Sequence, residues 1–327
     1  MTALLLVLVG LLGLAVGSFL NVVVWRVPQG MSVVSPPSAC PVCGHAIRPR
    51  DNVPVLSWLV LRGRCRDCRA PISVRYPLVE VGTAVAFVVV ALHFGASWTL
   101  PAFLYLAAVG IALALIDLDT FRLPDALVLP SYPVVAVLLV LASVNPGGTS
   151  DWWALARGAI GAVTLAAFYL VAWWFGGGLG DVKLAGVLGL ATAWLGWGPF
   201  LVGTFAAYLL GSVATVPLYF VVLARRLRRR LRGESSTVQE DAADRAADAA
   251  PQASVREAAD DGAGDHAGDD SETTDEPEDD DAGERIGNIR WIGRKTKIPF
   301  GPSMLLGAVI GIGWGQQLWD SLLGVGR

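Results

Sequence analysis

The stretch "LAAFYLVAWWFGGGLGDVKL" (165–184) places two ionisable residues, Asp181 and Lys183, directly after an apolar run typical of a membrane-buried helix. A charged side chain near the hydrocarbon of a bilayer costs about 3 kcal/mol or more, so it is usually retained for a function. The stretch therefore predicts a membrane span that is followed at once by a functional loop.

The composition of the whole chain agrees with a membrane protein. Of its 327 residues, 54% are hydrophobic and 16% are charged, whereas soluble domains carry roughly 25% charged residues. Apolar stretches of about 20 residues are long enough to cross a bilayer. Eight such stretches are predicted, of which the sixth is short enough to be re-entrant or tilted: 3–25, 78–96, 100–118, 126–144, 152–175, 182–197, 199–224 and 300–322.

The distribution of basic residues predicts the orientation of these spans, because loops rich in Lys and Arg face the cytoplasm. No base precedes the first span, which is unlike a cleaved signal, and Arg26 follows it. We place Arg26 on the cytoplasmic side and let the chain cross the membrane eight times. Of the 22 bases that do not belong to the acidic segment 233–285, all then face the cytoplasm except Arg157 and Arg327. We therefore expect both chain ends on the outer side.

Residues 233–285 are strongly acidic, with 19 acids and three bases, and contain almost no large apolar side chains. Such a segment cannot bury enough surface to offset its ordering entropy, so we expect a disordered cytoplasmic insert. A solvated loop, a partner-binding tail and a counter-charge for nearby arginines are all open as its role. The predicted parts are the first span (1–25), a cysteine loop (26–77), a membrane core (78–232), the acidic insert (233–285) and the last span (286–327).

All four cysteines lie in the cysteine loop, in two C-x-x-C turns: Cys40 with Cys43, and Cys65 with Cys68. Two such turns can supply four thiolates to one tetrahedral zinc ion. Disulfides or unpaired thiols are the alternatives, and a reducing cytoplasm disfavours disulfides. We expect a structural zinc, with His45 as a solvated neighbour. The sequence thus predicts an all-α polytopic membrane protein with about eight transmembrane helices and a small cytoplasmic zinc-binding loop.

Two aspartate clusters lie at the inner ends of predicted spans: "IDLDTFRLPD" (116–125) and "GLGDVK" (178–183). Two carboxylates held close together in water-poor surroundings share one proton. The ionised one can act as a general base on water, and the protonated one can polarise a carbonyl. Alternatively, Asp117 and Asp181 cap helices or pair with Arg122 and Lys183. The residues by themselves leave these interpretations open.

Five segments together resemble the type IV prepilin peptidases, and the resemblance covers nearly everything except the acidic insert. The segments are "GSFLNVVVWRVP" (17–28), the cysteine-containing stretch 35–80, "IDLDTFRLPD" (116–125), "GLGDVKL" (178–184) and "KIPFGPSMLLGA" (297–308).

The resemblance implies a set of site residues. Asp117 matches the family's first catalytic aspartate, with Asp119 as the near rival, and Asp181 matches the second, which closes a G-x-G-D motif. Gly178 and Gly180 precede it. Together with Lys183 and Asp119, these glycines would form the active-site loop that meets the substrate.

The resemblance also implies an activity. A membrane aspartic peptidase core at 78–232 would cleave the short leader of type IV prepilins or pseudopilins at the cytoplasmic face of the inner or plasma membrane. It would then methylate the new N-terminus with S-adenosylmethionine, in association with the cysteine loop. The partners would be these substrates and the lipid bilayer, with no nucleic acid. The other function class is a zinc-stabilised membrane scaffold or a transporter with ion-binding aspartates, which would hold its aspartates at mid-bilayer depth.

Overall fold

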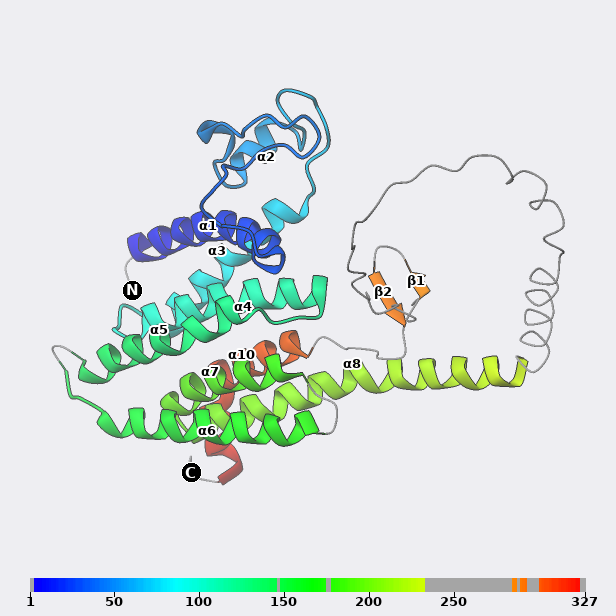
Figure 1. Ribbon diagram of the computed structural model, residues 1–327. Helices are drawn as coiled ribbons and strands as arrows, with labels where there is room; N and C mark the ends of the chain where they lie inside the picture. The colour runs from blue at the N-terminus through cyan, green and yellow to red at the C-terminus, as the bar shows by residue number, and fades with distance from the viewer. Residues whose placement is uncertain are drawn as a thin grey trace, which may run out of the picture. The chain divides into compact units, whose positions relative to one another are not determined.

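The structure is a computed structural model that describes residues 3–145, 148–174, 178–232, 284–286, 289–292 and 300–323. Its helices are α1 (Ala3–Arg26), α2 (Leu56–Val60), α3 (Arg75–Phe94), α4 (Leu100–Thr120), α5 (Asp125–Val144), α6 (Trp152–Trp174), α7 (Leu179–Leu195), α8 (Trp197–Arg232) and α10 (Gly301–Leu323) (Figure 1). Two short strands are β1 (Glu284–Ile286) and β2 (Ile289–Ile292).

The predicted all-α membrane architecture is confirmed, because each of the eight predicted spans overlaps one helix. Within the described residues, five helices are long and apolar enough to cross a membrane, namely α1, α3, α4, α5 and α6. The sixth predicted span is short, as expected: α7 has 17 residues. The acidic insert lies outside the described residues except for its last two, which begin strand β1.

The chain divides into two compact units. The first comprises Met1–Ser212 and Lys297–Arg327 and contains the bundle together with the cysteine loop. The second, Val213–Thr296, contains the far part of α8 and the antiparallel pair of β1 and β2, in which Ile286 faces Ile289.

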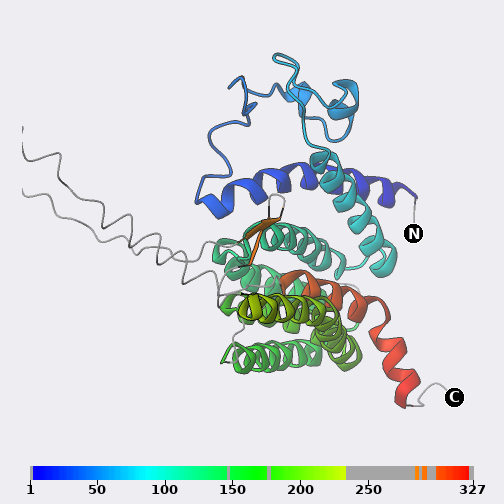
Figure 2. The ribbon, with the colours of Figure 1, turned by 90° about the vertical axis from the view of Figure 1, so that its right-hand side faces the viewer.

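Helices α4, α5, α7 and α10 supply most of the buried core of the first unit, whose largest fully buried side chains include Leu113, Leu139 and Val187. α10 lies beside both α4 and α7, although it is remote from them in sequence (Figures 1 and 2). Large apolar side chains such as Val163 and Phe205 point outward and are about 70% exposed. Val163 belongs to α6 and Phe205 to α8. Such an outward apolar surface is expected of helices that face lipid in place of water.

Small residues bring α6 and α7 into direct contact. A Cβ atom built on Gly161 would lie 2.7 Å from the carbonyl oxygen of Gly189, and one built on Gly189 would overlap the Gly161 carbonyl in return. Such small-residue contacts let membrane helices pack backbone against backbone. The contact fixes α7, whose first turn carries Asp181, against α6.

Candidate active site

Asp117 lies in the last turn of α4 and is 5% exposed. Its Oδ2 atom accepts a hydrogen bond of 3.0 Å from the backbone N–H of Gly301, the first residue of α10. A buried carboxyl group needs such a partner, because an unpaired polar atom in the interior is costly. The contact places the beginning of α10 next to the end of α4.

The sequence after Asp117 explains why α4 ends there. Phe121 adopts the left-handed conformation, with φ of 53°, and its N–H donates to the carbonyl of Asp117 at 2.9 Å. A residue in this conformation is a common way to terminate a helix. Pro124 follows Leu123 and precedes Asp125, the first residue of α5. A proline disfavours the helical conformation in the residue before it, here Leu123, so the segment between α4 and α5 stays non-helical.

Asp181 lies in the first turn of α7, whose N-terminal flanking residue is Gly178. Its side chain is half-buried, and Asp117 lies near enough for the charge of one carboxyl group to act on the other. Leu123 lies next to the beginnings of both α7 and α10. Its side chain is 3.0 Å from a Cβ atom built on Gly180 of α7 and 3.4 Å from one built on Gly301 of α10. The structure therefore brings together the two aspartates that the sequence selected, from helices α4 and α7.

Asp119 is placed differently from Asp117, although it is only two residues further along α4. It is exposed and forms an ion pair with Arg75, the first residue of α3, with Nη1 and Oδ1 3.0 Å apart. Residues two apart lie on nearly opposite faces of a helix. Asp119 therefore does not face the buried site of Asp117.

Lys183 also has its own partner. Its Nζ atom lies 2.7 Å from both carboxylate oxygens of Asp125. In the part of the chain that the structure describes, no ion pair joins Asp117 or Asp181 to a base. The pairing of these aspartates with Arg122 and Lys183 is therefore not what the structure contains, whereas the capping alternative holds for Asp117, whose carboxylate accepts the first N–H of α10.

An aromatic group adjoins the two aspartates and was not identified from the sequence. The Phe300 ring lies 6.5 Å from that of Tyr169 in α6 and 6.0 Å from that of Tyr208 in α8. Tyr169 is buried and interacts electrostatically with Asp181. The only sequence signal for this group is that Phe300 and Gly301 belong to the segment "KIPFGPSMLLGA" (297–308).

The four cysteines form the compact cluster that the sequence predicted. Their sulfur atoms all lie within 4.8 Å of one another, and the Sγ atoms of Cys40 and Cys68 are 3.7 Å apart. Four sulfur atoms around one zinc ion at 2.3 Å would be separated by about 3.8 Å. The cysteines carry no disulfide, and His45 is not part of the cluster. The residues Cys40, Cys43, Cys65 and Cys68 therefore fit a zinc ion.

Backbone hydrogen bonds shape each C-x-x-C turn. The Cys40 N–H donates to the His45 carbonyl at 2.9 Å, and the Cys65 N–H donates to the Ala70 carbonyl at 2.8 Å. A pair of charged side chains supports the loop from outside: Arg66 Nε donates to Asp51 Oδ2 at 2.8 Å, and this hydrogen bond lowers the pKa of Asp51. The thiols are thus held together by the fold of the loop itself.

The cysteine loop is fastened to the membrane helices through Glu80, a buried residue of α3. Its Oε2 atom accepts a hydrogen bond of 2.7 Å from the Val55 N–H, which lies between the two C-x-x-C turns. Figure 2 shows the loop beyond the C-terminal end of α1 and the N-terminal end of α3. The loop is therefore positioned by α3, which also carries the Arg75 partner of Asp119.

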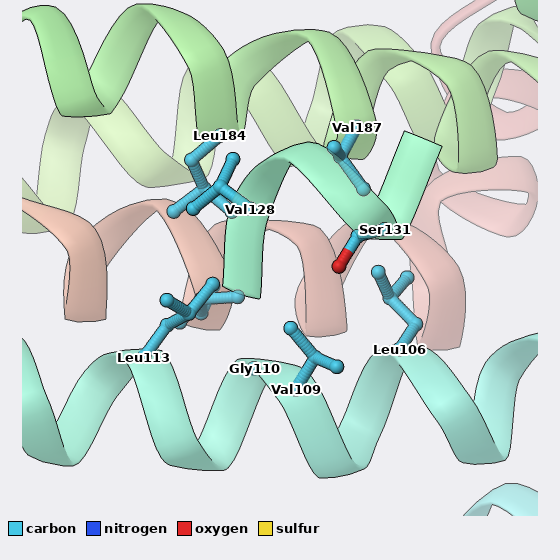
Figure 3. Close-up of a pocket in the computed structure, with 9 residues that line it drawn as sticks. Leu106, Val109, Gly110, Leu113, Val128, Ser131, Leu184 and Val187 are labelled. Atoms are coloured by element: carbon cyan, nitrogen blue, oxygen red, sulfur yellow. The ribbon is translucent and has the colours of Figure 1, made fainter. Parts of the chain in front are cut away.

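A small cavity between α4, α5, α7 and α10 lies apart from this chemistry (Figure 3). Apolar side chains such as Leu106, Leu113 and Val187 line it. Its one hydroxyl, on Ser131, donates to the Leu127 carbonyl at 2.7 Å. The cavity contains no ionisable group and is an imperfection in the packing of the core.

Comparison with known proteins gives matches over most of the chain. Residues 11–94 match the family described as bacterial peptidase A24 N-terminal domain, and residues 104–216 match the type IV leader peptidase family. No solved structure matches the chain.

Three curated relatives are each named prepilin leader peptidase/N-methyltransferase. The relative from Myxococcus xanthus is 34% identical over 300 residues, which cover 90% of this chain and 86% of the relative. The one from Aeromonas hydrophila is 38% identical over 246 residues, covering 64% and 80% of the two chains. The one from Pseudomonas aeruginosa is 40% identical over 238 residues, covering 63% and 78%.

Proposed function

The chain belongs to the type IV leader peptidase family, and on that premise we propose that it is a membrane endopeptidase that removes the leader of prepilin-like proteins. We further propose that it N-methylates the new N-terminus, as the names of its relatives say of them. The observation that supports the peptidase proposal is that Asp117 and Asp181, from two helices remote in sequence, lie near enough for their charges to interact, with Leu123 next to Gly180 on one side and Gly301 on the other.

In the proposed peptidase step, Asp117 and Asp181 act as one unit. The ionised carboxylate takes a proton from a water molecule, whose oxygen attacks the carbonyl carbon of the scissile peptide bond. The protonated carboxyl group donates a hydrogen bond to the carbonyl oxygen and later supplies a proton to the departing amine. The half-buried position of Asp181 and the buried position of Asp117 support this role, because limited access to water favours a shared proton.

The position of the aspartates along their helices favours a peptidase over a transporter. Asp117 lies in the last turn of α4 and Asp181 in the first turn of α7. Ion-binding residues of a transporter would lie near the middle of the bilayer instead. Arg122 and Lys183 lie close to the same helix ends, and by the positive-inside rule this supports a site at the cytoplasmic face of the inner or plasma membrane.

The active-site loop is proposed to bring the substrate to this pair. Gly178 and Gly180 flank Leu179 at the beginning of α7, and their missing side chains let Asp181 and Leu123 approach the backbone closely, with 3.1 Å from a Cβ built on Gly178 to Asp181 Oδ2 and 3.0 Å from one on Gly180 to Leu123. Asp119 and Lys183 stand at the exposed rim, each in an ion pair with a neighbour. We propose that these two charged residues lie where the substrate meets the site and take no part in proton transfer.

The proposed methylation takes S-adenosylmethionine as a second substrate, and the cysteine loop is its associated region. Zinc bound by Cys40, Cys43, Cys65 and Cys68 would fill all four of its coordination positions with thiolates, so it would serve a structural purpose. The chain's own contribution is to hold the loop on α3 through the hydrogen bond from Val55 to Glu80.

The test is to incubate the purified, full-length protein with a prepilin and S-adenosylmethionine, and to measure the product mass. We expect a pilin shortened by its leader, which carries one added methyl group when the methyl donor is present. An unprocessed prepilin under conditions in which a known prepilin peptidase cleaves it would contradict the proposed peptidase function. A cleaved product without the methyl group would contradict only the methyltransferase part.

A further inference from the structure

The first residue of α10 touches the peptidase site through its backbone. The Gly301 N–H donates to Asp117 Oδ2 at 3.0 Å, across 184 residues of sequence. The first N–H groups of a helix have no partner within the helix. Asp117 supplies that partner for α10, and α10 in return fixes one oxygen of the Asp117 carboxyl group.

Gly301 leaves no room for a side chain at this contact. A Cβ atom built on it would lie 2.8 Å from Asp117 Oδ2 and 3.4 Å from Asp117 Cγ. The first distance is shorter than real Cβ atoms show, so the carboxyl group would have to move. Glycine therefore permits the close approach of backbone to carboxylate that the hydrogen bond requires.

Phe300 holds Gly301 in this place. Its ring packs against Tyr169 and Tyr208, and it lies so close to Gly211 of α8 that a Cβ atom there would overlap the ring. The ring thus anchors the beginning of α10 against α6 and α8, while the next residue reaches Asp117 of α4. The same aromatic group adjoins Asp181 through Tyr169.

We propose that Gly301 is a positioning residue of the peptidase, whose N–H keeps the Asp117 carboxyl group turned toward Asp181. The inference rests on the proposed peptidase function. It adds a third element to the two aspartate-bearing helices, and this element follows the acidic insert in the sequence. Gly301 itself touches no reacting atom and acts only through Asp117.

The test compares Gly301→Ala with Gly313→Ala, which lies on the same helix and has no atom within 4 Å of its added Cβ. A displacement of about 1 Å at a catalytic group can lower the rate about 100-fold. We expect kcat for prepilin cleavage to fall about 100-fold in Gly301→Ala, with KM within about threefold of the unchanged protein. Gly313→Ala should keep its activity, and both variants should methylate a pre-cleaved pilin equally.

Cleavage by Gly301→Ala within about threefold of the Gly313→Ala rate would overturn the inference while leaving the peptidase function intact. If Gly301→Ala does not insert into the membrane, Phe300→Ala decides, because it loosens the anchor and keeps the glycine. We then expect about a tenfold lower kcat at unchanged KM, and full activity would overturn the inference. Failure of the unchanged protein to cleave would instead count against the proposed function.

Discussion

Asp117 and Asp119 show how two carboxylates in one helical turn come to differ in chemistry. Asp117 is buried and bound to a backbone N–H, whereas Asp119 is exposed and bound to the guanidinium group of Arg75. An exposed ion pair contributes about 0–1 kcal/mol to stability. The buried residue is the one whose surroundings suit proton transfer, and the exposed residue is suited to contact with a charged substrate.

Asp119→Asn should therefore retain cleavage within about tenfold of the unchanged protein, because only a weak, exposed ion pair is removed. The measurement compares the rate of prepilin cleavage by Asp119→Asn with that by Asp117→Asn. Protease protection checks that both variants are inserted in the membrane. An inactive Asp119→Asn beside an active Asp117→Asn would move the catalytic position by two residues.

At the scale of elements, the contact between α6 and α7 carries the position of Asp181. Gly189→Ala would drive a methyl group into the backbone of Gly161, and overpacking of this kind costs about 1–3 kcal/mol. We expect a lower Tm in detergent than for Gly82→Ala, which adds the same methyl group where no atom lies within 4 Å. An equal Tm for the two variants would show that the helices can separate without cost.

The cysteine loop is the second element with a separate prediction. Cys40→Ser combined with Cys43→Ser leaves two thiolates, too few to hold a structural metal tightly. We expect less bound zinc and impaired methylation of a pre-cleaved pilin, with a smaller effect on prepilin cleavage. His45→Ala is the matched control and should keep its metal, because His45 is outside the cluster. Absence of zinc from the unchanged protein, by metal analysis, would refute the zinc site.

At the scale of the whole molecule, the acidic insert lies in the sequence between α8 and α10, and the aromatic group beside the aspartates includes Tyr208 of α8 and Phe300, the residue before α10. None of the sequence motifs lies within the insert. Deletion of residues 236–283 should leave cleavage within about threefold, since these residues contain almost no large apolar side chains that could pack on the bundle. A complete loss of cleavage at normal levels of inserted protein would assign the insert a catalytic or docking role.

The sequence predicted the helices well, because apolar length reports directly on them, and its local motifs selected two aspartates whose catalytic role stays a prediction. It could not predict Gly301 as the partner of Asp117, since the two are 184 residues apart and glycine has no side chain to signal a contact. Likewise, it offered Lys183 as a partner of Asp181, but residues two apart on a helix do not face each other, and Lys183 binds Asp125 instead.

The central claim, that Asp117 and Asp181 act as one unit, is tested most directly by the product mass of prepilin incubated with Asp117→Asn, Asp181→Asn and the double variant. Asparagine nearly matches the shape of aspartate but cannot exchange the proton. Each single variant should cleave about 10⁴-fold more slowly or worse, and the double variant should be little worse than either, as expected for residues that act together. All three should still methylate a pre-cleaved pilin. Cleavage near the unchanged rate by both single variants would contradict the account.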